Sequence, residues 1–187
     1  EELVDWVLRA YEEDRRIPYP AMVVLGPFMA PEHQNEFLHR AQRLGNVRMT
    51  TFDTRLEELM ANAIGVVAMG GYNTFCEILS FDKRAIIVPR THPRLEQFIR
   101  ARAARNIGLI EMLDPNRGYD PLAMATALRH LPQQGVPSDV VVPGLLDGLG
   151  SVWRLVSKQL SNPHRGPASL GVAEQPGAHA ASELASE

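Results

Sequence analysis

Two adjacent glycines, Gly70 and Gly71, end a short apolar run and are followed at once by a helical pattern. Residues 65–69 are apolar in succession, which is typical of a strand in a parallel sheet that is covered on both faces. Glycine has no Cβ, so the backbone can turn sharply there and a ligand can come close. The helix is predicted to begin at about Asn73, and the free N–H groups of its first turn would favour an anion. This stretch therefore predicts a phosphate or nucleotide site.

Glu77 is the acidic residue of this stretch, four residues after Asn73, and would project from the same face of the helix. Beside a bound phosphate, a carboxylate at that position is suited to accept hydrogen bonds from sugar hydroxyls. The same residues also fit a capping box, in which Thr74 caps the helix and Glu77 reaches back to a free amide. The residues alone leave both interpretations open, and the two can coexist.

The composition limits the class of protein. The chain has 187 residues, of which 45% are hydrophobic and 22% charged, as in one globular domain with some additional sequence. A net charge of −3 gives no general basic field, so nucleic acid is not expected as a partner. The single cysteine, Cys76, has no partner for a disulfide, which favours a reducing, cytoplasmic location. No apolar run reaches the roughly 20 residues that cross a bilayer, so no transmembrane segment is expected.

Apolar runs alternate with helical patterns along the chain. The predicted strands are residues 21–25, 46–52, 65–69, 85–88 and 108–113. The predicted helices are an amphipathic helix at the start of the chain, a helix from about residue 73, and residues 31–44, 55–63, 94–106, 121–131 and 145–160. This alternation predicts an α/β fold with an open, doubly wound parallel sheet and helices on both faces. Residues 161–187 contain very few large apolar residues and are expected to be a disordered tail.

Ligands of such sheets bind beyond the carboxyl ends of the strands, near the point where the strand order reverses. Four loops are expected at those ends, namely residues 26–30, 52–54, 69–74 and 89–97. In the helix after the last of these loops, Leu95, Phe98 and Ile99 are expected to face inward. Its arginines, Arg100 among them, are assigned mainly to a solvated face. The four loops together form the candidate site.

The segment from Gly70 to Leu79, the run of residues 85–89 and the pair Glu96 and Gln97 carry a family resemblance. In combination they resemble the C-terminal half of two-domain nucleotide-sugar glycosyltransferases with the GT-B fold, over about residues 20–110. Within that fold, the chain resembles the peptidoglycan N-acetylglucosaminyltransferase type, which adds a sugar to a lipid-linked intermediate. The resemblance implies a Rossmann-like sheet and a nucleotide-sugar (donor) binding domain over residues 1–160.

The resemblance also implies a role for individual residues. Gly71, Asn73 and Thr74 would lie at the donor diphosphate, and Glu77 would accept hydrogen bonds from the ribose hydroxyls. The backbone around Phe52 would contact the base, while Glu96 and Gln97 match a pair that reaches the donor sugar. The implied donor-binding residues are thus Phe52, Gly70, Gly71, Asn73, Thr74, Glu77, Glu96 and Gln97.

Two parts of the family pattern are absent from this sequence. The family's donor domain opens with a strand and a glycine-rich loop before its first helix, and this first strand is missing here. The N-terminal acceptor domain, which supplies the usual catalytic base, is missing too, so the catalytic residue is unknown. We therefore expect an N-terminally truncated enzyme whose partners are a nucleotide-sugar donor, an unidentified acceptor and the missing domain. The chain alone is expected to be inactive.

The expected reaction is transfer of a hexosyl or N-acetylhexosaminyl group from a nucleotide diphosphate sugar to an acceptor hydroxyl. No cofactor is expected beyond that co-substrate. No metal is expected either, because the sequence has no Asp-x-Asp motif or His/Asp cluster suited to one, and helix-terminal amides would stabilise the leaving group. Two alternatives remain open: a nucleotide-sugar 2-epimerase built on the same half, and a non-catalytic nucleotide-binding or interaction module.

Overall fold

The computed structural model describes residues 1–140 and Ser157, and its helices and strands alternate along residues 1–140. The helices and strands are α1 (Glu2–Glu13), β1 (Ala21–Val24), α2 (Pro31–Leu44), β2 (Val47–Thr50), α3 (Leu56–Asn62), β3 (Gly65–Ala68), α4 (Tyr72–Ser80), β4 (Arg84–Ile87), α5 (Glu96–Asn106), β5 (Glu111–Met112) and α6 (Pro121–His130). Three short 3-10 helices follow β5 or α6, namely η1 (Pro115–Arg117), η2 (Leu131–Gln133) and η3 (Pro137–Asp139). The predicted α/β fold is confirmed. Apart from Ser157, the predicted helix of residues 145–160 and the predicted tail of residues 161–187 lie outside the described residues.

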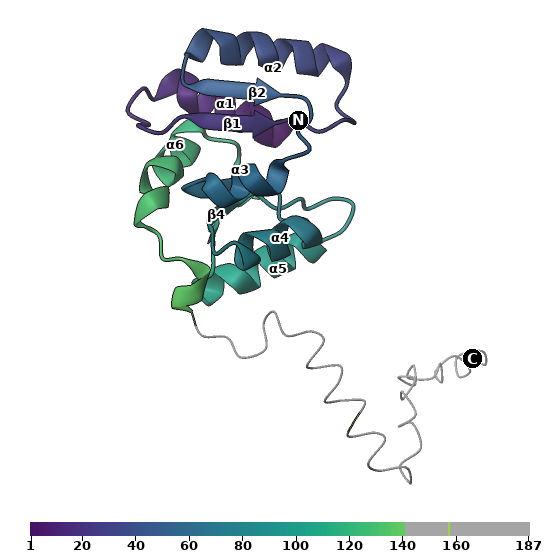
Figure 1. Ribbon diagram of the computed structural model, residues 1–187, viewed down its shortest axis with the longest axis vertical. Coiled ribbons are helices and arrows are strands. Elements are labelled where there is room, and N and C mark those ends of the chain that lie inside the picture. Colours follow the sequence, from purple (N-terminus) through teal and green to yellow (C-terminus); the bar gives the residue numbers. More distant parts are fainter. Residues whose placement is uncertain (141–156, 158–187) are drawn as a thin grey trace, which may run out of the picture. The chain divides into compact units, whose positions relative to one another are not determined.

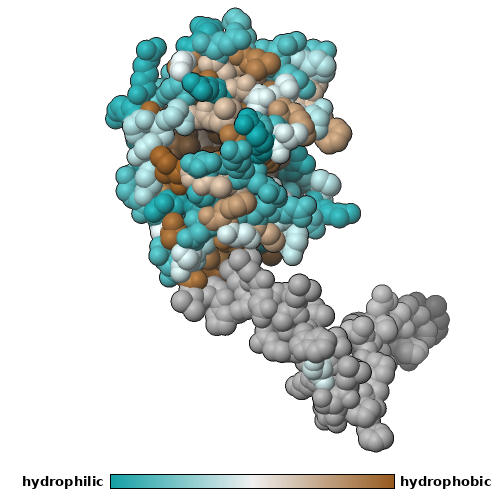
Figure 2. Space-filling view, in the orientation of Figure 1, coloured by the Kyte–Doolittle hydropathy of each residue, from teal (hydrophilic) through white to brown (hydrophobic). Residues whose placement is uncertain are grey.

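The described strands form two parallel sheets, with the orders β1-β2 and β3-β4-β5 (Figure 1). A doubly wound sheet has the strand order 3-2-1-4-5-6. Without its first strand this order becomes 3-2 and 4-5-6, and these two groups match the two sheets. The inner edges of β1 and β3 pair with no strand of the described chain. Figure 2 shows a hollow with apolar residues at its rim below the β1-β2 sheet. The division of the sheet thus falls where the doubly wound order has a strand that the described residues do not supply.

Strand β4 is the central strand of its sheet, and both of its faces are buried. Ile86 and Val88 pack into a first core with buried residues of α1, α2 and α6. Ala85 and Ile87 point the other way and pack into a second core with α4 and α5. This alternation has the period of two that a strand imposes on its side chains. The run is apolar throughout because helices cover both faces.

Helix α1 fills much of the first core. Its Trp6 is only 1% exposed, and the indole Nε1–H donates a hydrogen bond of 2.7 Å to the carbonyl oxygen of Asp120. The Trp6 ring meets Tyr119 edge to face, with 5.0 Å between the ring centres. Asp120 in turn caps α6 by accepting a hydrogen bond from the backbone N–H of Leu122. One aromatic side chain thus joins the first helix to the start of the last described one.

Gly70 determines how the chain passes from β3 into α4. Its φ of +74° lies in the left-handed region that favours glycine. A Cβ at this position would lie 2.8 Å from Cγ2 of Ile87, which is fully buried. Helix α4 then begins directly, with Gly71 as the N-cap residue and a 2.8 Å hydrogen bond from the Phe75 N–H to the Gly71 carbonyl oxygen. Both the backbone conformation and the packing therefore require glycine at position 70.

Replacement of Trp6 by Phe tests the junction between α1 and α6. The variant loses one of three N–H groups that donate to the Asp120 carbonyl oxygen, the other two being the backbone N–H groups of Ala123 and Met124. We therefore expect the free energy of unfolding to fall by about 0.5–1.5 kcal/mol, the net value of one hydrogen bond. Chemical denaturation measures this change. Tyr119→Phe is the control, because it removes only an exposed hydrogen bond to Glu2. Equal stability of the two variants would contradict this account of the junction.

Replacement of Gly70 by Ala tests the packing of the turn. Gly45, at the end of α2, has a φ of +68°, but a Cβ there would meet nothing within 4 Å. Backbone strain alone should therefore lower the free energy of unfolding of Gly45→Ala by about 1–2 kcal/mol. In Gly70→Ala the free energy of unfolding should fall by about 1–3 kcal/mol more than in Gly45→Ala, because Ile87 cannot move without disturbing the second core. Urea unfolding of both variants measures the difference, and equal losses would show that Ile87 does not restrict the turn.

Candidate functional site

The start of α4 does not have the predicted capping box. Gly71 is the N-cap residue, and among the described residues no side chain caps the helix. Thr74 therefore lies inside the first turn and is not its cap, so the predicted capping box with Glu77 does not form. The physical reason is that an N-cap residue must precede the helical dihedrals, whereas the glycine turn starts the helix at Tyr72. The first N–H groups of α4 are left without a side-chain acceptor.

The polar side chains of Asn73, Thr74 and Glu77, in the first two turns of α4, are also unpaired. Asn73 is exposed, and Thr74 and Glu77 are half-buried. None of the three side chains makes a hydrogen bond or ion pair with a described residue. Asn73 and Glu77 are four residues apart in a helix, so they share one face. A carboxylate without a protein partner is available to accept hydrogen bonds from a ligand.

The loop after β4 is bonded to the glycine turn. The Arg90 Nε–H donates to the sulfur of Met69 at 3.3 Å, and Nη1 of Arg100 donates to the Gly70 carbonyl oxygen at 3.0 Å. The backbone N–H of Arg90 donates to Oε1 of Gln97 over 3.2 Å. The structure thus brings the loop, the first turn of α5 and the glycine turn into one network of contacts.

Glu96 and Gln97 lie side by side in the first turn of α5 but differ in their surroundings. The carboxamide oxygen of Gln97 is held by the loop, so its NH₂ group remains as a donor. Glu96 is exposed and has no hydrogen bond or ion pair with a described residue. Gln97 therefore has a fixed orientation near the turn, whereas the described contacts do not fix Glu96.

The inward face of α5 was predicted correctly only for Phe98, which packs against the second core. Leu95 and Ile99 are 55% and 54% exposed, while Ala101 and Ala104 are buried. The small alanines allow close packing of α5 in the second core, and Arg100, beside them on the helix, reaches the glycine turn. The role of Arg100 was therefore missed. The spacing of Gln97, Ala101 and Ala104, at i, i+4 and i+7, was the available signal for this face.

Phe52 follows β2 and so belongs to the other sheet. Its side chain is 61% exposed, and its carbonyl oxygen accepts a 3.0 Å hydrogen bond from Oγ1 of Thr50. The Phe52 N–H is therefore the backbone group left to contact a base. No hydrogen bond, ion pair or ring contact within the described part of the chain joins Phe52 to the glycine turn. In Figure 1 the loops that follow β1, β2 and β4 nevertheless lie on the same side of the two sheets.

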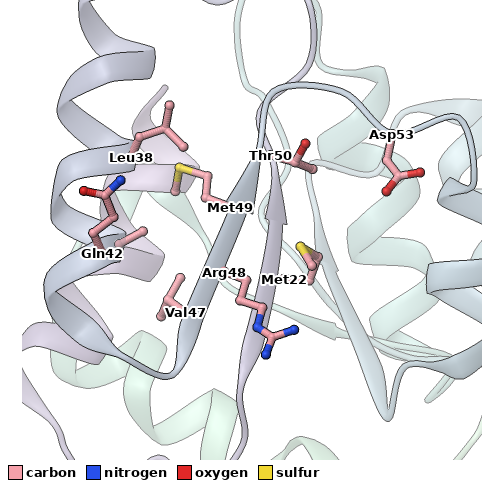
Figure 3. A pocket seen from close by; sticks show the side chains of 9 residues that line it. Met22, Leu38, Gln42, Val47, Arg48, Met49, Thr50 and Asp53 are labelled. Carbon is pink, nitrogen blue, oxygen red and sulfur yellow. The ribbon is translucent and has the colours of Figure 1, made fainter.

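A cavity of about 430 Å³ lies along β2 and not at the glycine turn (Figure 3). It is lined by Met22, Leu38, Ala41, Gln42, Val47, Arg48, Met49, Thr50 and Asp53. Of the four predicted loops, only the one that follows β2 contributes to it, through Asp53. The cavity offers neither a helix N-terminus nor a glycine turn, which are the features that bind phosphate. We therefore place the candidate site at the glycine turn.

Two general features of the described residues bear on the class of site. No group of three or more His, Cys, Asp or Glu side chains in this part of the chain is placed to hold a metal ion. No helix of the described part is long and apolar enough to cross a membrane. The polar groups found at the glycine turn are backbone amides, side-chain amides, carboxylates and guanidinium groups.

Comparison with known families agrees with this geometry. The model of the glycosyltransferase family 28 C-terminal domain matches residues 11–118, more than half of the chain. The matched part runs from α1 to the end of η1 and contains the glycine turn and every predicted donor-binding residue. No curated protein matches the chain. The predicted resemblance to a GT-B donor half is confirmed at the level of the family: the chain belongs to the glycosyltransferase family 28 C-terminal domain.

Proposed function

We propose that the chain is the donor-binding half of an enzyme that transfers a sugar from a nucleoside diphosphate sugar to an acceptor hydroxyl. The observation that carries this proposal is the uncapped start of α4 next to the unpaired carboxylate of Glu77. Phosphate and ribose are adjacent in a nucleotide, so a site for both needs amides and a carboxylate in neighbouring places. Membership of the glycosyltransferase family supports the proposal.

The diphosphate would lie against the first turn of α4. The N–H groups of Tyr72, Asn73 and Thr74 lie in the first turn, where they have no acceptor within the helix. They carry the positive end of the helix dipole, which favours phosphate oxygens. The same amides would stabilise the negative charge that develops on the leaving diphosphate in the transition state. Gly70 and Gly71 place no Cβ in the way of the phosphates.

The remaining donor groups would be bound by the residues around the turn. Glu77 would accept hydrogen bonds from the ribose hydroxyls, and the Phe52 N–H would contact the base. Gln97 would donate through its free NH₂ group to a hydroxyl of the sugar, and the unpaired carboxylate of Glu96 would accept from another. Each contact pairs a group left free in the described structure with one that the donor carries.

The proposed reaction is a displacement at the anomeric carbon. The acceptor hydroxyl loses its proton to a base, its oxygen bonds to the anomeric carbon, and the bond to the diphosphate oxygen breaks. The nucleoside diphosphate leaves with the electron pair. We place the base on an acceptor domain outside this chain, so this chain alone would bind a nucleotide without turnover. Within the family we propose hexosyl or N-acetylhexosaminyl transfer of the peptidoglycan N-acetylglucosaminyltransferase type.

Glu77→Gln tests the ribose contact. The probe is whichever of UDP, dTDP and GDP binds the wild-type chain with the highest affinity. The variant should bind this nucleotide roughly tenfold more weakly, because the carboxylate would accept hydrogen bonds from two hydroxyls. Its thermal stability should stay unchanged, since Glu77 does not cap α4. Isothermal titration calorimetry measures the affinity, and Glu57→Gln, a change at an exposed carboxylate of α3, is the matched control.

The 2′,3′-dideoxy form of the same nucleotide separates a ribose contact from an indirect effect. It should bind the wild-type chain and Glu77→Gln with equal affinity, because the hydroxyls that Glu77 would contact are absent. If Glu77→Gln weakens the dideoxy nucleotide as much as the natural one, Glu77 does not bind the ribose.

A further inference from the structure

We propose that Arg100 is a positioning residue, which holds the glycine turn in the conformation that presents the first amides of α4. The effect on donor binding rests on the proposed function, whereas the effect on the turn itself does not. The role is unexpected from the sequence, in which Arg100 is one of several arginines along α5.

Two contacts of Arg100 lie on either side of Gly71. Nη1 donates a 3.0 Å hydrogen bond to the carbonyl oxygen of Gly70, and the guanidinium carbon lies 5.4 Å from the centre of the Tyr72 ring. Gly70 ends the turn and Tyr72 is the first residue of α4. One side chain from α5 therefore holds both neighbours of the N-cap residue.

Packing alone does not hold this part of the turn. A Cβ on Gly71 would meet nothing within 4 Å, so no group packs against Gly71 in that direction. Tyr72 is 68% exposed. Glycine has more backbone freedom than any other residue and loses the most on ordering. The contacts of Arg100 are thus the described interactions that restrain Gly71 from the side of α5.

The charge of Arg100 strengthens both contacts. The side chain is half-buried, and no carboxylate among residues 1–140 forms an ion pair with it. A hydrogen bond from a charged donor is roughly twice as strong as a neutral one, and the planar guanidinium can stack on a ring while it donates. Arg90 bonds to Met69 on the other side of the turn and has no carboxylate partner in the described chain either. The positive charge of both residues would favour a diphosphate at the turn.

The test compares Arg100→Met with Arg102→Met. Arg102 lies in the same helix and stacks on Phe98 at 5.7 Å, but it is exposed and makes no described hydrogen bond to the turn. Amide ¹⁵N relaxation measures the order of Gly70, Gly71 and Tyr72 without a ligand. In Arg100→Met the order parameter of Gly71 should fall from about 0.85 to below about 0.6, and in Arg102→Met it should not change. Thermal unfolding followed by circular dichroism checks that both variants fold.

Nucleotide affinity is the second measurement, with UDP, dTDP and GDP as probes. For the nucleotide that the wild-type chain binds with the highest affinity, Arg100→Met should lower the affinity roughly tenfold, and Arg102→Met should leave it unchanged. Arg100→Lys keeps the charge and a donating ammonium group but not the planar fork, so both the order of Gly71 and the affinity should be partly restored relative to Arg100→Met.

The outcomes separate this proposal from the proposed function. A rigid Gly71 in Arg100→Met overturns the positioning role, and so does a loss of affinity without loss of order, since that pattern indicates direct contact with phosphate. If the wild-type chain binds none of the three nucleotides, the proposed function fails, while the relaxation data still decide the role of Arg100.

Discussion

The close contact between Gly70 and Ile87 fixes the residue at which α4 begins, and the candidate site depends on that residue. Because Gly70 turns with a positive φ directly over a buried side chain, Gly71 becomes the N-cap and Tyr72 the first helical residue. A helix with Thr74 as its N-cap residue would have its first amides satisfied by side chains, with Glu77 bonded to the backbone. The observed start leaves the amides and Glu77 free, which converts an ordinary helix start into a place that can accept an anion.

The contact is effective because the strand beneath it cannot move. Strand β4 is covered on both faces, and its Ile86 packs in the same core as Val47 of β2. One core therefore touches both sheets although no described strand joins them. Through this shared core the Phe52 loop and the glycine turn, which have no direct described contact, could keep a fixed relation within the proposed donor site.

The sequence predicted the features that depend on local rules and missed those that depend on distant residues. Strand β4 was recognisable because burial on both faces makes its run continuously apolar from Ala85 onward. Helix α2 was predicted with its observed bounds because Pro31 opens it and Gly45 follows its end. The glycine turn was likewise visible in two residues. The inward face of α5 was predicted correctly only for Phe98, because Leu95 and Ile99 are exposed while the alanines of the helix are buried. The capping box was wrong because Thr74 and Glu77 have the right spacing, while the start of the helix is decided by Ile87, ten residues after Glu77. The contact of Arg100 with Gly70 spans thirty residues and has no local pattern at all.

The most direct test of the central claim is a ¹H–¹⁵N correlation titration of the chain with UDP, dTDP and GDP. A site at the start of α4 predicts that at least one of these nucleotides shifts the amide signals of Gly71, Tyr72, Asn73 and Thr74 in a saturable way, with larger shifts there than elsewhere. Saturable shifts confined to residues that line the cavity along β2, such as Arg48 and Thr50, would contradict the account. So would the absence of any saturable shift at the four amides with all three nucleotides.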